Sequence, residues 1–241
     1  AIGRIEGPVI AVIQAGNVNT GGFDPADAIA DALSAHPNAW LHVDGAFGLW
    51  AAATPRLRHL VAGVDRADSW STDAHKWLNV GYDCGFVAVR EADAHRAAMA
   101  ASASYLMRSE QRENWEWVLD SSRRARGFIL YAALRSLGRS GVRALVERCC
   151  ALARRMADQL READDVAVLN DVVLNQVLVR FGDSDERTRE VIAAVQEDGT
   201  AWMGGTTWQG KAAMRISVSN WSTTEADADR TVEAILRCAR R

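Results

Sequence analysis

The sequence has few cysteines and few prolines. Among its 241 residues there are 4 of each, and the cysteines, at positions 84, 149, 150 and 238, match neither a zinc-binding spacing nor a disulfide framework. We therefore expect reduced, structural thiols and no metal site. Cys84 is the cysteine that could instead line a site, because it lies close in sequence to a lysine discussed below.

The chain also lacks an excess of basic charge and a long apolar run. Its formal net charge is -3 and its pI is about 6.0, so nothing in its charge indicates a nucleic-acid partner. No apolar run approaches the roughly 20 residues of a membrane span, and the first residues do not resemble a signal peptide. With 49% hydrophobic and 24% charged residues, the composition is typical of an ordered globular protein, which we expect in the cytoplasm.

Apolar runs and helical patterns alternate over the first ninety residues. The β-branched run from Gly7 to Ala15 is typical of a parallel strand buried on both faces. A strand, a helix and a second strand follow one another within forty residues, which predicts a right-handed crossover in a parallel sheet. The expected elements are strand 7–15, helix 24–35, and strands 40–43, 68–72 and 85–89, the last of these antiparallel.

Beyond Arg90 the sequence becomes mainly helical and then mixed. Glycines at positions 138 and 141 are expected to separate two long helices, and the final third alternates between strands and helices as in a small α+β domain. The expected elements are helices 92–103, 123–137 and 142–163, strands 167–169, 176–181, 200–204 and 212–218, and helices 185–198 and 224–240.

One lysine directly follows a predicted strand. In the stretch from Ala67 to Leu78, Lys76 falls beyond the carboxyl end of strand 68–72, the place where open α/β sheets bind ligands. Its amine could form a Schiff base with a carbonyl compound. The alternative is an ordinary solvated lysine, since lysines are rarely buried.

A carboxylate follows the preceding predicted strand in a similar way. Asp44 ends the run Trp40–Val43 and is followed by the small residues Gly45 and Ala46. A carboxylate here suits the ring nitrogen of pyridoxal 5'-phosphate (PLP), and Ala46 would let a flat ring lie against the same face. A cap or turn role for Asp44 is the alternative. His42 shares the strand face of Asp44 and could orient it, or could be a satisfied core histidine.

Four motifs together resemble the group II PLP-dependent amino-acid decarboxylases, a family that includes aromatic-amino-acid, glutamate and histidine decarboxylases. They are GNVNTGGFDP from position 16, HVDGAFG from position 42, ADSWSTDAHKWLNVGYDCG from position 67 and SRRAR from position 122. The resemblance covers about residues 7–235. It implies an α/β chain of the PLP-dependent transferase fold type I, with residues 1–121 as the second half of the large PLP-binding domain, 122–163 as connecting helices and 164–241 as a small α+β domain.

The resemblance also implies roles for single residues. Lys76 is expected to be the Schiff-base lysine and Asp44 the partner of the ring nitrogen, which makes these two the expected catalytic residues. His75 is expected to contact the cofactor near its phosphate, and Ala46 to contact its ring. For His75 the alternative is a histidine that only braces its loop.

Three further residues receive roles from the resemblance. Asn17 and Thr20 are expected to contact the cofactor or substrate, with turn formation as the alternative. Arg215 is expected to hold the substrate's α-carboxylate through a forked pair of hydrogen bonds, with a structural salt bridge as the alternative. The implied reaction converts an L-amino acid, aromatic or acidic, to an amine and CO2.

The sequence departs from the family in three ways. Family members are much longer, and the half that this sequence does not match carries their phosphate loop and the histidine that stacks on the ring. We therefore expect a fragment, a proteolysed chain or one part of a split enzyme, acting as a homodimer or with a separate N-terminal half. The family's Gly-Thr-Thr is Gly16-Asn17-Val18 here.

The third departure concerns the proton donor. The segment 107–120, which matches the loop that supplies a catalytic tyrosine in the animal enzymes, contains no tyrosine. This leaves open an aldehyde-forming or other PLP reaction. A second alternative, from a different functional class, is a non-catalytic or regulatory half of a PLP-enzyme assembly.

Overall fold

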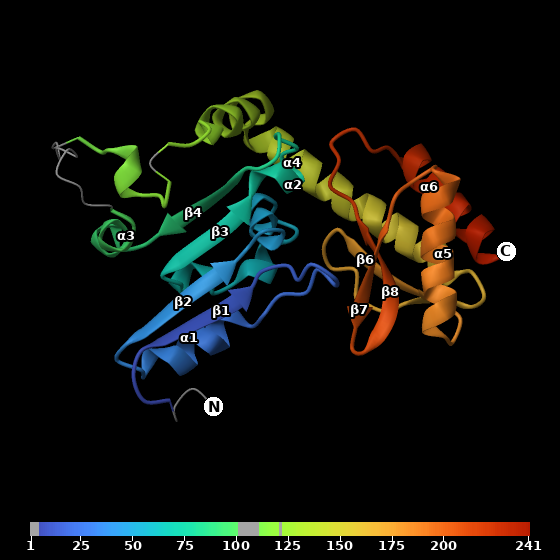
Figure 1. The fold of residues 1–241 in the computed structure, drawn as a ribbon, viewed down its shortest axis with the longest axis horizontal. Helices are drawn as coiled ribbons and strands as arrows, with labels where there is room; N and C mark the ends of the chain where they lie inside the picture. Colours follow the sequence, from blue (N-terminus) through green and yellow to red (C-terminus); the bar gives the residue numbers. More distant parts are fainter. Residues whose placement is uncertain (1–4, 101–110, 121) are drawn as a thin grey trace.

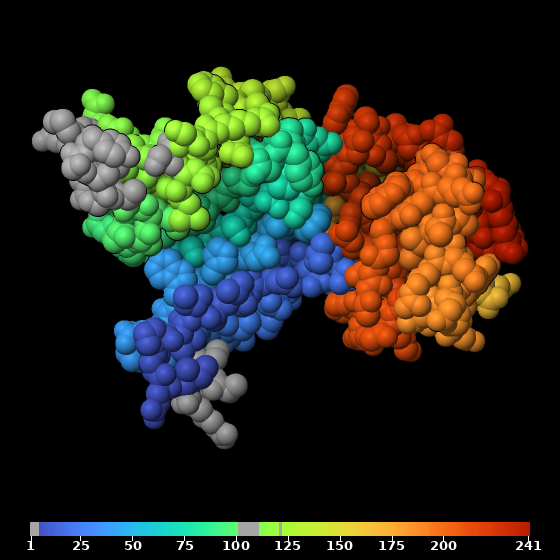
Figure 2. Space-filling model, in the orientation of Figure 1, coloured from blue at the N-terminus to red at the C-terminus, as the bar shows by residue number. Residues whose placement is uncertain are grey.

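The computed structural model describes residues 5–100, 111–120 and 122–241. In this part of the chain the strands form two four-stranded sheets, in the orders β1-β2-β3-β4 and β5-β6-β8-β7. The two sheets lie side by side and the long helix α4 runs from one to the other (Figure 1). The space-filling view shows the same two masses, blue to green and orange to red, in contact with each other (Figure 2). The chain thus has the expected α/β architecture.

The first sheet joins strands that are near neighbours in the sequence. β1 pairs with β2 and β2 with β3 in parallel, whereas β3 pairs with β4 antiparallel, as the sequence predicts. The expectation that the first strand is buried on both faces was wrong: Ile10 and Val12 of β1 are 75% and 62% exposed, because α1 covers only the other face of this strand among the described residues. Helix α1 buries Ala26, Ala30 and Leu33 against the strand residues Leu41 and Val43, and this apolar contact covers one face of the sheet. The elements are β1 Val9–Gln14, α1 Ala26–Ser34, β2 Ala39–Asp44, β3 Ser69–Asp73 and β4 Gly85–Val89.

Short helices lie between the strands of this sheet and after its last strand. They are η2 Gly48–Ala53, η3 Arg58–Val61 and η4 Val64–Arg66 between β2 and β3, α2 Ala74–Trp77 between β3 and β4, and α3 Ala92–Met99 and η5 Asn114–Glu116 beyond β4. The helix expected over 92–103 therefore ends at Met99, and Ala100 is already extended. Positions 101–103 lie outside the described residues.

Helix α4, Arg126–Arg161, is divided where the sequence predicts a separation between two helices. Gly138 has a positive φ of 60° with ψ -178°, which divides α4 into two helical segments. Gly141 keeps the helix, so the separation is narrower than the expected stretch from Gly138 to Gly141. A residue with a side chain would be strained at this positive φ, which explains why the kink lies at a glycine.

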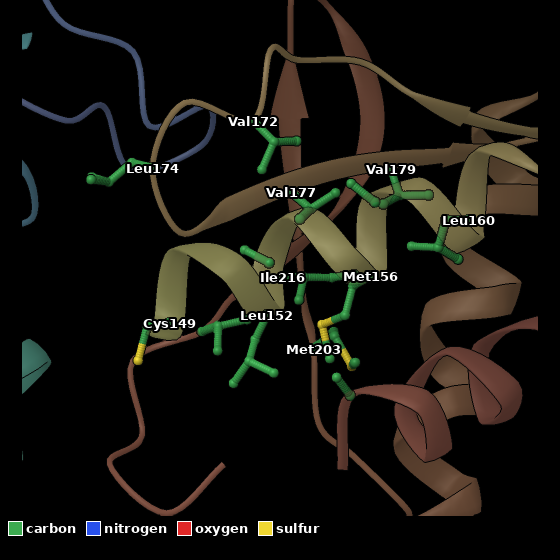
Figure 3. Close-up of a cluster of buried hydrophobic side chains, with 14 of the residues drawn as sticks. Cys149, Leu152, Met156, Leu160, Val172, Leu174, Val177, Val179, Met203 and Ile216 are labelled. Atoms are coloured by element: carbon green, nitrogen blue, oxygen red, sulfur yellow. The ribbon is translucent and has the colours of Figure 1, made fainter. Parts of the chain in front are cut away.

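The second segment of α4 supplies one side of the largest core cluster. Its buried positions include Leu152, Met156 and Leu160, which pack against Val177 and Val179 of β6. Figure 3 shows these side chains between the helix and the strand. Every third or fourth residue of this segment faces the sheet, the spacing expected for an amphipathic helix.

The second sheet is entirely antiparallel and carries two helices. Helix α5 begins at the cap Ser184 and ends at Gly199, which has φ 73°, and α6 begins with a capping box between Thr224 and Asp227. The elements are β5 Val166–Val168, β6 Gln176–Phe181, α5 Asp185–Asp198, β7 Gly204–Trp208, β8 Lys211–Ser217 and α6 Glu225–Ala239.

The strand expected over 200–204 was placed wrongly. β7 begins at Gly204 and forms a hairpin with β8 in which Trp208 lies opposite Lys211. The two turn residues, Gln209 and Gly210, have φ 48° and 78°, as in a type I′ turn. The turn fixes the register of the hairpin. The position of β7 therefore follows from this register and not from the apolar residues that precede Gly204.

Two further expectations concern side chains and long helices. All four cysteines are free and buried, in agreement with the structural thiols that the sequence predicts. Among the described residues, no helix combines enough length with enough hydrophobicity to cross a membrane.

Candidate active site

Asp44 and Lys76 follow neighbouring parallel strands. Asp44 is the last residue of β2 and pairs in register with Ser71 of β3, and β3 is followed at once by α2, which contains Lys76. Since parallel strands end at the same edge of a sheet, both residues belong to the carboxyl edge where α/β folds bind ligands.

The amine of Lys76 touches segments that follow both strands. Its Nζ lies 2.8 Å from Oδ2 of Asp73, at the end of β3, and 4.2 Å from the ring centroid of Phe47, which follows Asp44 by three residues. The Lys76 side chain is 24% exposed. The lysine is therefore half-buried and held in one place, unlike the solvated surface lysine that was the alternative.

The carboxylate of Asp44 shapes the turn behind it. Its Oδ1 accepts a hydrogen bond of 3.1 Å from the backbone N–H of Ala46, which fixes the small residue beside the carboxylate. His42 lies with Nδ1 2.7 Å from Oγ of Ser69 and Nε2 3.2 Å from Oγ of Ser71. Both ring nitrogens are thus taken up by β3, which matches the satisfied histidine that the sequence left open.

His75 is packed into its own loop. Its Nδ1 lies 3.1 Å from both the backbone N and the backbone O of Cys84, and its ring lies 4.2 Å from that of Tyr82. These contacts are those of a histidine that braces the loop, while a contact with a cofactor phosphate stays a prediction. Burial raises the pKa of the Cys84 thiol, which keeps it neutral.

Trp77 anchors the turn that carries Lys76. It is fully buried, and its Nε1 donates a 2.7 Å hydrogen bond to the carbonyl of Phe47. One residue of α2 therefore holds the loop after β2 while its neighbour Lys76 rests on the ring of the same phenylalanine.

The side chains of Asn17 and Thr20 stabilise the loop after β1. Oδ1 of Asn17 accepts hydrogen bonds from the backbone N–H groups of Asn19 and Thr20, and Oγ1 of Thr20 accepts one from Gly22. This is the turn chemistry named as the alternative. A cofactor contact for either residue stays a prediction.

Arg215 reaches from the second sheet to this loop. Its Nη1 donates a 3.4 Å hydrogen bond to the carbonyl of Val18. Within the part of the chain that the structure describes, no carboxylate lies in ion-pair distance of Arg215, so the structural salt bridge that was the alternative is not formed there.

Three residues of the site were not singled out from the sequence. Asp73 pairs with Lys76 at the spacing i, i+3, which was a readable signal. Phe47 was quoted only within a motif. The long-range contacts of Asn79 have no local signal, because Ser219 and Trp221 lie 140 and 142 residues away.

Comparisons with known proteins identify the family of the chain. Residues 3–181 match the family model described as the pyridoxal-dependent decarboxylase conserved domain. The chain is 28% identical over 195 residues to an aromatic-L-amino-acid decarboxylase of Drosophila lebanonensis, covering 80% of this chain and 48% of that protein. It is 28% identical over 211 residues to a 4-hydroxyphenylacetaldehyde synthase of Rhodiola rosea, covering 83% and 43%.

A solved structure with the same fold completes the comparison. The Oryza sativa TDC crystallised with PLP and tryptamine superposes with a TM-score of 0.88 at 25% identity, covering 96% of this chain and 50% of that one. The chain therefore spans about half the length of the relatives it matches.

Proposed function

The chain belongs to the pyridoxal-dependent decarboxylase family, and from this premise we propose that it takes part in removing the carboxyl group of an L-amino acid, aromatic or acidic, to give an amine and CO2. Because it spans about half the length of its relatives, we propose this reaction for a larger or split enzyme in which the chain is one part. The cytoplasm is the proposed compartment.

One observation carries the proposal: a half-buried lysine amine and a carboxylate follow adjacent parallel strands. Lys76 contacts the ring of Phe47, and Phe47 follows Asp44 by three residues. The donor set fits PLP, because a primary amine suits its aldehyde and a carboxylate suits its ring nitrogen. The small Ala46 beside Asp44 leaves room for a flat ring on the strand face.

Bound PLP supplies an electron sink for the carbon that loses the carboxylate. Lys76 would hold this group through its amine, and the carboxylate of Asp44 would be the partner of the ring nitrogen. Asp73, whose Oδ2 lies 2.8 Å from the Lys76 amine, orients that amine.

Arg215 is proposed to bind the substrate carboxylate. Its guanidinium touches the loop after β1 through Val18 and meets no acid among the described residues. A free guanidinium prefers a carboxylate in forked geometry, and it would orient the group that leaves. Asn17, Thr20 and His75 are proposed to contribute contacts through the loops they already stabilise.

The first sheet has apolar residues that further protein could cover. β1 and β4 are its edge strands, and Ile10 and Val12 on β1 are 75% and 62% exposed, while Phe86 and Val87 on β4 are 40% and 49% exposed. Exposed apolar edges of this kind favour association with another chain or segment. They support the proposal that a homodimer or a separate N-terminal half completes the site.

An aldehyde-forming reaction is the second candidate, favoured by the absence of tyrosine in segment 107–120 and by the likeness to an aldehyde synthase. Positions 107–110 lie outside the described residues. A non-catalytic half is the third candidate, although it does not account for the joint presence of Lys76 and Asp44.

The test mixes the chain with PLP and with a polypeptide that spans the family half it does not match. We expect a visible absorption band that is lost in Lys76→Ala and kept in Lys211→Ala. Lys76 and Lys211 are the chain's only lysines, which makes this a complete control pair. Product analysis with L-tryptophan, L-tyrosine and L-glutamate then separates an amine from an aldehyde.

A band that persists in Lys76→Ala would overturn the assignment of the lysine. The absence of any band, with the second half folded and present, would favour the non-catalytic reading.

A further inference from the structure

Three segments that are distant in the sequence line a hollow away from the proposed PLP site. Its volume is about 370 Å³, within the range of about 300–1,000 Å³ that is typical of small-molecule sites. It is lined by residues 56–60 around η3, by residues 147–161 of α4 and by residues 171–173 of the loop between β5 and β6. None of the residues assigned above to the PLP site lines it.

Cationic side chains surround this hollow. Arg56, His59, Arg154 and Arg161 all line it. Arg161 pairs with Asp158 at 2.8 Å. The guanidinium groups of Arg56 and Arg154, in contrast, have no ion pair and no hydrogen-bond acceptor within the described ranges.

The two carboxylates in the wall do not cancel this charge. Glu147 accepts hydrogen bonds from the Thr54 hydroxyl and from Nε of Arg143 at 3.2 Å, so its charge already has partners. The hydrogen bond from Thr54, and to a smaller extent that from Arg143, holds the pKa of Glu147 below its ordinary value. Asp171 is the other carboxylate, and it is exposed. Among the described residues that line the hollow, neither Arg56 nor Arg154 forms an ion pair with Glu147 or Asp171.

The remaining lining is apolar. It consists of Leu57, Leu60, Cys150, Ala151, Val172 and Val173. Cys150 is 5% exposed, and burial raises the pKa of its thiol to about 12, so the thiol is neutral at pH 7. The charges of Arg154 and Arg56 oppose part of that rise.

We propose that this hollow is a binding site for a small oxyanion carried on an apolar group, of the class of an aryl phosphate or aryl carboxylate. Arg56 and Arg154 bind the oxyanion through charge-assisted hydrogen bonds, for which the planar guanidinium is well shaped. The apolar group lies against the side chains of Leu57, Leu60 and Val172. The site is separate from the proposed PLP site, and it does not depend on the reaction proposed above.

Isothermal titration calorimetry of the purified chain, without PLP, tests the site with three probes. Phenyl phosphate presents both parts of the ligand class, inorganic phosphate presents only the oxyanion, and phenylacetate replaces the phosphate by a carboxylate. We expect phenyl phosphate to bind more tightly than inorganic phosphate, because only the former buries apolar surface. The comparison with phenylacetate identifies which oxyanion the guanidinium groups prefer.

Four variants locate the binding. Arg56→Gln and Arg154→Gln each remove one charge-assisted contact and are expected to weaken phenyl phosphate binding by about tenfold. Arg135→Gln removes the same charge from an exposed position of the same helix, outside the hollow, and is expected to change binding by less than about twofold. Lys76→Ala is expected to leave it unchanged, which separates this site from the lysine site.

Three results would overturn the proposal. The first is no heat of binding with phenyl phosphate up to about 10 mM, a concentration at which even weak specific sites fill. The second is equal binding by Arg56→Gln, Arg154→Gln and the unmodified chain. The third is a loss in Arg135→Gln as large as that in Arg154→Gln, which would indicate a general effect of charge.

Discussion

Asn79 joins the turn that carries Lys76 to the loop between β8 and α6, and its replacement by glycine tests how much that link stabilises the chain. Its Nδ2 lies within hydrogen-bond distance of the carbonyls of Lys76, Trp77 and Ser219, at 3.1, 2.8 and 2.7 Å. Its Oδ1 accepts a 3.0 Å hydrogen bond from the backbone N–H of Trp221. Two of these four contacts join segments that are 140 residues apart or more.

The size of the effect follows from these contacts. An amide group has two N–H bonds, so it donates two strong hydrogen bonds at once and accepts one, and an exposed bond is worth about 0.5 kcal/mol. Asn79→Gly removes three such bonds and is therefore expected to lower the free energy of unfolding by about 1.5 kcal/mol. Asn79 has φ 52°, a conformation that glycine adopts without strain, so the backbone itself does not oppose the substitution.

Gln209→Gly is the matched control. Gln209 has φ 48° and lies in the β7–β8 turn, and its side chain forms no hydrogen bond with any described residue. This variant changes the backbone in the same way and removes no hydrogen bond. We expect the Tm of Asn79→Gly to lie about 3–6 °C below that of Gln209→Gly, from about 2–4 °C per kcal/mol for a chain of this size.

Thermal unfolding followed by circular dichroism gives both values, and hydrogen exchange gives the local effect. The amide of Trp221 should exchange faster in Asn79→Gly, since it loses its acceptor. Equal Tm values for the two variants, together with unchanged exchange at Trp221, would refute the claim that Asn79 links the Lys76 turn to the loop between β8 and α6.

Other predictions address packing and charge. Gly48→Ala should lower the free energy of unfolding, measured in urea, by about 3 kcal/mol, because the added Cβ would lie 2.3 Å from the carbonyl oxygen of Ala15. Gly127→Ala is the control: nothing lies within 4 Å of its Cβ, so the substitution should be neutral or slightly stabilising. Equal losses in the two variants would contradict this packing. Leu160→Ala, at a fully buried position, should cost about 2–5 kcal/mol; a cost below 1 kcal/mol would contradict its place in the core. The pKa of Asp229 is lowered to about 2, mainly by a hydrogen bond from Arg155 and further by one from Gln159. The stabilisation that the ionised Asp229 gives the folded chain is therefore present above pH 4 and is lost as the pH falls toward 2. The Tm of Asp229→Asn should accordingly lie below that of the unmodified chain at pH 7, with a gap that closes between about pH 4 and pH 2; a gap independent of pH would contradict the link.

Much of the fold follows from local sequence signals. Helix α5 has the predicted bounds because Ser184 caps one end and Gly199 ends the other. β6 has the predicted bounds because its run of β-branched and apolar residues is buried on both faces. The parallel pairing of the first sheet was predictable because two apolar strands separated by a helix favour it. The open face of β1, with Ile10 and Val12 exposed, was not predictable from its apolar sequence.

Other features depend on contacts that are distant in the sequence. β7 was misplaced because its register is fixed by the Gln209–Gly210 turn and by pairing with β8, not by its own hydrophobicity. Gly141 stays helical because the packing of α4 overrides its low helix propensity. At the site, Lys76, Asp44 and Arg215 could be named from the resemblance. The contact of Arg215 with Val18, and those of Asn79 with Ser219 and Trp221, form only in the tertiary fold.

Borohydride reduction tests the central claim most directly. The chain, with the second half of the domain present, is incubated with stoichiometric PLP and reduced, and peptides are then weighed by mass spectrometry. Lys76 sits in a half-buried site while Lys211 is exposed, so the account predicts the phosphopyridoxyl mass on the peptide with Lys76 and its loss in Asp44→Ala. Labelling of Lys211 alone, or labelling of Lys76 that is indifferent to Asp44, would contradict it.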